Sequence, residues 1–265
     1  MPEGYRARPD RPYDARMALR PSTILAIALA IALVVTQLVY PQVPDGWTMP
    51  MTAITVWLFL GASLAAAWSR SGPRYALALA GLAFAVGLAS EIVGVHTGFP
   101  FSTYAYTDAL QPQLAGVPIV IPLAWAMMAY PAWRVGELIG WSPLSRALIA
   151  AGALTAWDVA LDPQMVGLGI WEWPNGGLYH GIPLVNFLGW FGVGVVLFGW
   201  WALAARGRPH RDEPVANALG PALYAWTWIG ETVAHALFFE GVGVGLASFL
   251  AMGVFAVPAL LRLRR

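Results

Sequence analysis

The chain lacks cysteine, and its 15 basic residues are all arginines. Without a thiol it can form no disulfide bond, no thiolate metal site and no cysteine nucleophile. Without a lysine amine it can form no Schiff base, which excludes the retinal-binding seven-helix proteins. Covalent chemistry through sulfur or a lysine nitrogen is therefore outside the reach of this protein.

Charged residues are also scarce. They make up 11% of the 265 residues, whereas 58% of the residues are hydrophobic. In a typical soluble domain, roughly a quarter of the residues are charged. Apolar segments of about 20 residues, enough to span a bilayer, lie near residues 22–40, 50–69, 75–95, 117–138, 146–162, 184–205, 216–238 and 243–261. The sequence therefore predicts an all-α, multi-pass bundle of about eight transmembrane helices in the cell membrane.

The positions of the arginines predict the orientation of the bundle. They are Arg6, Arg8, Arg11, Arg16, Arg20, Arg70, Arg74, Arg134, Arg146, Arg206, Arg208, Arg211, Arg262, Arg264 and Arg265. All of them fall on one side of the expected spans, and by the positive-inside rule that side is the cytoplasm. We therefore expect both termini in the cytoplasm. The expected parts are an arginine-rich arm at 1–21, one membrane domain at 22–262, and outer loops at 96–116 and 163–183.

A cleaved signal peptide is an alternative interpretation of the first 40 residues. The apolar run there is longer than the hydrophobic region of a signal peptide, and no small-residue cleavage site follows it closely. We therefore interpret residues 22–40 as the first membrane helix.

A weak internal repeat joins two of the expected helices. "GVPIVIPLAW" (116–125) and "GIPLVNFLGW" (181–190) share Gly, Pro, Val, Leu and Trp at matching places. Each segment follows an outer loop and opens a helix that runs inward, and parallel repeats commonly enclose a site between them. The alternative is that Gly-x-Pro merely suits the start of a membrane helix.

The stretch "TAWDVALDPQ" (155–164) places two aspartates inside an expected span. An ionised carboxylate there costs roughly 2.5 to 3.5 kcal/mol on the insertion scale, so intramembrane acids are functional candidates. Asp158 and Asp162 are four residues apart, on one face of the helix, and two such carboxyl groups tend to share a proton. The alternative is a helix-end cap, with Asp162 before Pro163 at the outer boundary.

Other acids occupy comparable depths. Glu91 precedes the first repeat as Asp158 precedes the second. Glu231 and His235, at i and i+4 on one helix face, suit a proton relay, a metal-ligand pair or a packing pair. The four histidines include no pair at metal-ligand spacing, so we expect no metal site.

Aromatic residues are concentrated in the expected outer loops, where interfacial belts explain many Trp and Tyr residues. A loop so rich in them, beside acids, is better explained as a lid over an apolar ligand. Asn186, in the sixth helix, is either a link between helices or an amide that positions water. The expected substrate-binding residues are Tyr104, Tyr106, Trp125, Trp157, Trp171, Trp173, Tyr179, His180, Asn186 and Trp190.

The acid candidates are expected to converge in the outer half of the bundle. They are Glu91, Asp158, Asp162, Glu231 and His235, with Glu172 and His180 from the second loop. A protonated carboxyl group in an aromatic pocket suits acid-initiated alkene chemistry: the acid protonates the double bond, aromatic faces stabilise the cation, and a base-held water adds. We expect Asp158 to be the acid, and Asp162 to reprotonate it or hold the water.

Three segments resemble the membrane carotenoid hydratases, the bisanhydrobacterioruberin hydratase group and its relatives that hydrate the acyclic end of γ-carotene. They are "SEIVGVHTGFPFSTYAYTD", "GVPIVIPLAW" and "WDVALDPQMVGLGIWEWPNGGLYHGIPLVNFLGW", which cover about residues 90–190. The resemblance implies addition of water to the terminal isopropylidene double bond of a C40 or C50 carotenoid, with no cofactor. The implied partners are the substrate in the bilayer and other carotenoid-pathway enzymes, and no nucleic acid.

Two other functions fit part of the pattern. An intramembrane prenyltransferase binds Mg²⁺-diphosphate through DxxxD-type acids, and "DVALD" is one such motif, but a second copy and nearby basic residues are missing. A proton-coupled transporter also has buried acids and repeats. The aromatic outer loops and the scarcity of acids toward the cytoplasmic half argue against a path through the bundle.

Overall fold

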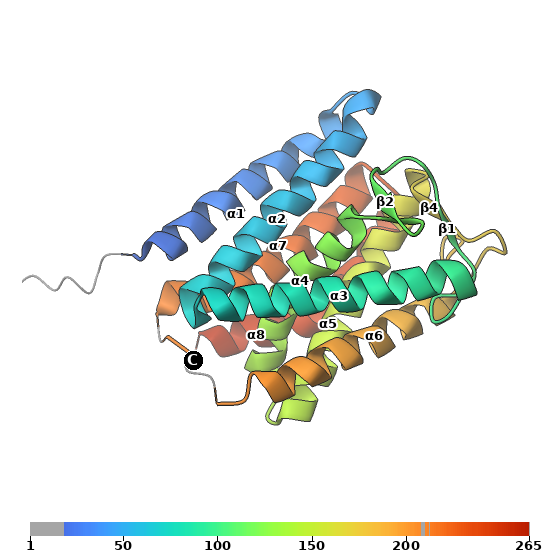
Figure 1. The fold of residues 1–265 in the computed structure, drawn as a ribbon. Helices are drawn as coiled ribbons and strands as arrows, with labels where there is room; N and C mark the ends of the chain where they lie inside the picture. Colours follow the sequence, from blue (N-terminus) through green and yellow to red (C-terminus); the bar gives the residue numbers. More distant parts are fainter. Residues whose placement is uncertain (1–18, 208–209, 212, 265) are drawn as a thin grey trace, which may run out of the picture.

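The computed structural model of the protein describes residues 19–207, 210–211 and 213–264. In this part of the chain it contains eight α-helices: α1 (Pro21–Val39), α2 (Thr48–Ser71), α3 (Pro73–Thr97), α4 (Val120–Ile139), α5 (Pro143–Gly167), α6 (Leu184–Ala204), α7 (Pro214–Leu237) and α8 (Val242–Leu263). The predicted all-α bundle is therefore confirmed (Figure 1). Most of the expected arm, residues 1–18, lies outside the described residues.

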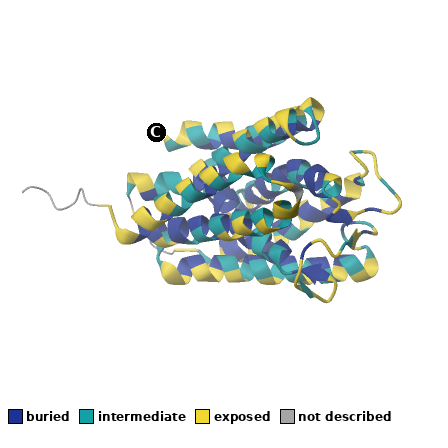
Figure 2. Cartoon of the chain, turned by 90° about the horizontal axis from the view of Figure 1, so that it is seen from above, coloured by how far each residue is buried: buried dark blue, intermediate teal, exposed yellow. Residues whose placement is uncertain are grey.

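Six of these helices are long and apolar enough to cross a membrane, namely α1, α2, α3, α5, α6 and α8. The protein is therefore a multi-pass membrane protein. Helices α4 and α7 are not among these six. Helix α4 is the buried centre of the bundle, with almost every side chain from Ile121 to Gly136 covered. Figure 2 shows the resulting pattern, with buried residues in the interior and exposed ones on the outward faces.

The helix boundaries follow from local chemistry. Proline occupies the first turn of α1, α3, α5 and α7, where its missing N–H costs nothing. Ser142 caps α5, and its hydroxyl and that of Ser145 form a reciprocal capping box. Gly72, with φ of 91°, separates α2 from α3.

Helix α5 continues through Pro163 to Gly167, so the second outer loop begins at Leu168 and Asp162 is not a helix-end residue. Proline lacks the N–H that would bond the carbonyl of Val159, four residues earlier. The Tyr179 hydroxyl donates to that carbonyl at 2.9 Å instead. The side chain of a neighbouring segment therefore replaces the lost helix bond, as membrane helices require.

The same replacement occurs at two other intrahelical prolines. Pro131 in α4 leaves the Met127 carbonyl without its helix partner, and the Ser63 hydroxyl donates to it at 2.6 Å. Pro221 in α7 likewise leaves the Asn217 carbonyl without its helix partner, and the Arg134 guanidinium donates to that carbonyl at 3.3 Å. These side chains fasten neighbouring helices to one another through the backbone.

The two repeat segments begin with matching turns. Ala115 and Gly116 have φ of 52° and 82°, between the paired strands β2 (Gln113–Leu114) and β3 (Val117–Pro118). His180 and Gly181 have φ of 49° and 81°, between the bridged residues Tyr179 and Ile182. Positive φ at both central residues is typical of a type I′ two-residue hairpin. The glycines of the repeat are thus turn residues, and the helices begin after them.

The two outer loops are joined by a short antiparallel sheet. Strand β1 (Ala105–Tyr106) from the first loop pairs with β4 (Trp171–Glu172) from the second. In Figure 1 these strands lie at the end of the bundle opposite the C-terminus. The sheet brings the aromatic residues of both loops over the ends of the helices that carry the acids.

Candidate functional site

The two aspartates of α5 form one buried group with an amide from α6. Asp158 and Asp162 are 0% and 2% exposed. Asn186, in the first turn of α6, donates from Nδ2 to Oδ2 of Asp158 at 3.0 Å and to Oδ2 of Asp162 at 2.6 Å. The other oxygen of Asp158, Oδ1, is buried and has no hydrogen-bond partner among the described residues. That oxygen is therefore left for a proton shared with Asp162 or for a ligand.

A second buried carboxyl group lies nearby, with a full set of donors. Glu91 of α3 accepts hydrogen bonds from the hydroxyls of Tyr104 at 2.5 Å and Tyr106 at 2.7 Å, and from the Trp125 indole at 3.2 Å. Burial, together with the Glu91 carboxyl, raises the pKa of both loop tyrosines. They therefore stay protonated and act as donors, which fixes the first outer loop on α3.

Indole rings lie between these groups and a small cavity. Trp125 of α4 stacks on Trp190 of α6 with ring centroids 4.1 Å apart, and Trp157 packs edge-on against Trp190 at 6.2 Å. Trp171 lies beside Asp162. These four indoles line a cavity of about 60 Å³ with apolar side chains of α2, α4 and α5. An apolar group in this cavity would meet aromatic faces, with Asp158 and Asp162 behind Trp157 and Trp171 and outside the cavity lining.

The structure separates the remaining candidates from this group. Glu172 and His180 are exposed, and His180 serves as a hairpin turn residue. His235 of α7 is buried with Nε2 at 3.0 Å from the Ala160 carbonyl and 3.9 Å from Glu231. Glu231 interacts with Trp157 rather than with the aspartates. The expectation that all seven candidates share one pocket is therefore wrong for Glu172 and His180, and Glu231 belongs to a different cavity.

The predicted aromatic residues take up mainly interior positions. Trp173 donates to the Phe101 carbonyl at 3.0 Å and packs against Tyr104. The Tyr179 hydroxyl is engaged by the Val159 carbonyl, and burial raises the pKa of Tyr179 to about 12. These two residues hold the loops in place and do not line either cavity.

The sequence analysis missed a larger cavity of about 370 Å³ between α1, α2, α5 and α7. Its walls are mostly apolar, with Glu231, Gln37 and Thr55 among its few polar side chains. Polar residues in the most apolar spans, such as Gln37 in α1, are the signal that could have indicated it. Within the described residues, no group of three His, Asp or Glu side chains is placed to hold a metal ion.

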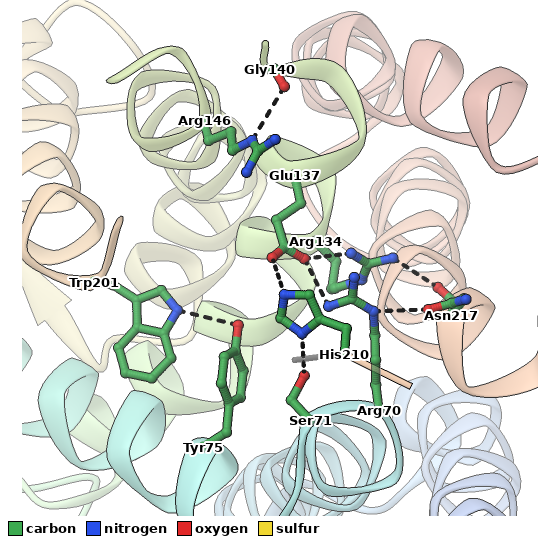
Figure 3. A network of polar contacts seen from close by, with 10 residues as sticks. All are labelled: Arg70, Ser71, Tyr75, Arg134, Glu137, Gly140, Arg146, Trp201, His210 and Asn217. Carbon is green, nitrogen blue, oxygen red and sulfur yellow. Dashed lines mark hydrogen bonds and ion pairs between the residues drawn. The ribbon is translucent and has the colours of Figure 1, made fainter. Parts of the chain in front are cut away.

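A further polar network, also missed, lies at the arginine-rich end of the bundle (Figure 3). Glu137 of α4 pairs with Arg134 on its own helix and with Arg70 of α2 at 3.1 Å. Arg70 also donates to Asn217 of α7 at 2.8 Å, and His210 lies 3.6 Å from Glu137. The network joins α2, α4 and α7 far from the aspartates, so it is structural with respect to the candidate site.

The chain is similar to proteins of carotenoid biosynthesis. The family described as carotenoid biosynthesis protein matches residues 48–255, from the start of α2 into α8. The bisanhydrobacterioruberin hydratase of Haloarcula japonica is 31% identical over 177 residues, which cover 62% of this chain and 57% of that protein. The matched part is thus little more than half of the relative's length. No solved structure matches the chain. Because the family match includes both repeats, both outer loops and all the buried acids, this chain belongs to the carotenoid biosynthesis protein family.

Proposed function

We propose that the protein is a hydratase of the cell membrane that adds water to the terminal isopropylidene double bond of an acyclic carotenoid end. The observation that carries the proposal is the buried Asp158 and Asp162 pair, held by one amide beside an indole-lined cavity. The family supports a carotenoid substrate, and the name of the Haloarcula relative supports hydration.

The reaction needs one proton donor and one water. The Asp158 carboxyl group transfers its proton to the alkene carbon that bears a hydrogen, and the electron pair of the double bond forms the new C–H bond. The resulting cation is tertiary, on the carbon with two methyl groups. Water adds its oxygen to that carbon and loses a proton to the aspartate pair, so that the pair is restored and a tertiary alcohol is formed.

The surroundings suit each part of this reaction. The faces of Trp125, Trp157 and Trp190 can stabilise a cation through their π electrons, by roughly 2 kcal/mol or more when desolvated. Asn186 keeps the two carboxyl groups together, so that the proton lost by one is within reach of the other. Glu91 accepts from the Trp125 indole and so acts as a positioning residue for the wall of the cavity.

The proposal is tested by expressing the chain in a cell that makes an acyclic carotenoid and weighing the extracted pigments. The expected result is a pigment heavier by one water, formed without added nucleotide or reductant. A matched culture that expresses Asp158→Asn should keep the unmodified pigment. A pigment lengthened by an isoprenoid unit would support the prenyltransferase alternative instead, and no change of mass with the wild-type chain would contradict hydration of that substrate.

A further inference from the structure

The large cavity between α1, α2, α5 and α7 has features that the proposed reaction does not use. Its rim carries Leu38, Ile229, Val233 and Phe238, large apolar side chains that are exposed on the outward face of the bundle. In a membrane protein an exposed apolar rim faces the acyl chains of the lipid. The cavity therefore opens sideways, toward the bilayer, between α1 and α7.

This cavity adjoins the smaller, indole-lined one. Trp157, Leu161 and Met165 of α5 line both of them, as do Val56 of α2 and Met127 of α4. An isoprenoid chain that leaves the small cavity would therefore pass into the larger one on its way to the lipid. Trp157, Leu161 and Met165 are thus the shared wall that such a chain would have to pass.

Most polar groups of the large cavity are occupied by neighbours. The Tyr40 hydroxyl lies 2.7 Å from the Thr52 hydroxyl, and Trp226 donates to Gln37 at 2.6 Å. Thr227 donates to the carbonyl of Leu223 in its own helix at 3.0 Å. These pairs are complete within the protein and offer little to a ligand.

The polar side chains that remain in this cavity are those of Thr55, Glu231 and Gln164, and the first two differ from the pairs above. Thr55 Oγ1 is buried and has no hydrogen-bond partner among the described residues. Glu231 interacts with Trp157, and its carboxyl group lies 3.9 Å from the His235 ring, with the side chain 16% exposed. A purely hydrocarbon ligand would bury both groups without new partners, which is costly for polar groups in an apolar site. A ligand hydroxyl could donate to Glu231 or accept from Thr55.

We propose that the large cavity is a binding site for an isoprenoid end that carries a hydroxyl group, with Thr55 and Glu231 as the residues that recognise it. The proposal rests on the proposed function in one respect: hydration at the indole-lined cavity would supply such an alcohol. In this account Glu231 determines specificity and takes no part in the protonation of the alkene. The cavity would hold the alcohol end as it moves from the indole-lined cavity toward the bilayer.

The test is a binding titration with two ligands. One is a carotenoid with a terminal tertiary alcohol, and the other has hydrogen in place of that hydroxyl and no terminal double bond. The purified full-length chain in lipid nanodiscs should bind the alcohol on the order of 10-fold more tightly, because a site built for a hydroxyl rejects the analogue that lacks it. Glu231→Leu and Thr55→Val should each reduce that preference, and the double variant should abolish it.

Thr227→Val is the matched control, because it removes a hydroxyl from the same cavity that is already bonded within its own helix. It should keep the preference. Equal binding of the two ligands by the wild-type chain would overturn the proposal, because it would show that the cavity binds apolar chains without recognising a hydroxyl group. An unchanged preference in the Glu231 and Thr55 variants would also overturn it. Because the titration measures binding and not turnover, a failure of hydration would leave this result standing.

Discussion

The indole rings of Trp125 and Trp190 stack 4.1 Å apart with an interplanar angle of 12°. They occupy the last position of each repeat segment, nine residues after the turn glycines Gly116 and Gly181. Two parallel units thus meet through equivalent residues. The first unit supplies Glu91, bonded to Trp125, and the second supplies the aspartates of α5.

The contact between α3 and the first outer loop should be sensitive to one added methyl group. A Cβ atom at Gly94 would lie 2.8 Å from the Tyr104 hydroxyl, which holds Glu91. Gly94→Ala should therefore shift Tyr104 and lower the hydration rate, on the order of 10-fold to 100-fold, as small misplacements near a site do. Gly81→Ala on the same helix meets no atom within 4 Å. It should retain the wild-type rate, and an equal loss in both variants would contradict the assignment.

The side-chain partners of the intrahelical prolines should contribute to stability. Ser63→Ala removes the only described donor to the Met127 carbonyl, which Pro131 leaves without its helix bond. We expect the free energy of unfolding to fall by about 0.5 to 1.5 kcal/mol, measured by denaturation in detergent. Ser90→Ala is the control, because its hydroxyl bonds the Gly87 carbonyl of its own helix. A loss no larger for Ser63 than for Ser90 would show that the proline site needs no donor.

The sequence predicted the helices and the aspartate pair because both depend on local patterns. Apolar runs marked the spans within a few residues, and spacing of four placed Asp158 and Asp162 on one face. The sequence could not predict that α5 passes through Pro163, because the compensating donor, Tyr179, comes from a distant loop. Pro163 was interpreted as the end of the helix, but the hydrogen bond from Tyr179 replaces the one that the proline removes.

The separation of Glu231 from the aspartates could not be predicted either. Depth along a helix follows from sequence, but the direction of a side chain around the bundle depends on which helices pack together. Trp157 and Asp158 are adjacent in sequence, yet Trp157 meets Glu231 while Asp158 meets Asn186. His180 was expected to be a substrate-binding residue, whereas its positive φ and its exposure make it a turn residue.

The orientation of the bundle in the membrane is a separate prediction. The arginine distribution predicts that the loops containing Gly98 and Asn175 face the outside. Reporter fusions after each of these residues should behave as exported. Cytoplasmic behaviour of both fusions would reverse the orientation and place the acids in the half of the membrane that faces the cytoplasm.

Acidification should weaken the contact of His210 with the arginine-rich network. Burial, and then the charge of Arg70, lower the pKa of His210 from its usual 6.5. Below pH 6.5 the unfolded chain therefore binds a proton at His210 more readily than the folded chain does. The contribution of His210 to stability is present above pH 6.5 and is lost as the pH falls through the pKa of His210 in the folded chain.

The corresponding measurement is thermal unfolding in detergent at pH 7.5 and pH 5.5. Acidification should lower the midpoint of the wild-type chain more than that of His210→Asn, because the variant lacks the titrating ring. All other acid-sensitive groups are common to both proteins and cancel in the comparison. An equal fall in the two midpoints would contradict a role for His210.

The central claim is that Asp158 gives its proton to the alkene, and hydration in D₂O tests it most directly. The wild-type chain should place one non-exchangeable deuterium on the carbon next to the new tertiary alcohol, because the new hydroxyl exchanges with solvent. Asp158→Asn should form no labelled alcohol while still binding pigment, and Asp162→Asn should be slower by about 10² to 10⁴, as is typical of one acid-base group. Normal labelling by Asp158→Asn, with no product from Glu91→Gln or Glu231→Gln, would contradict the account.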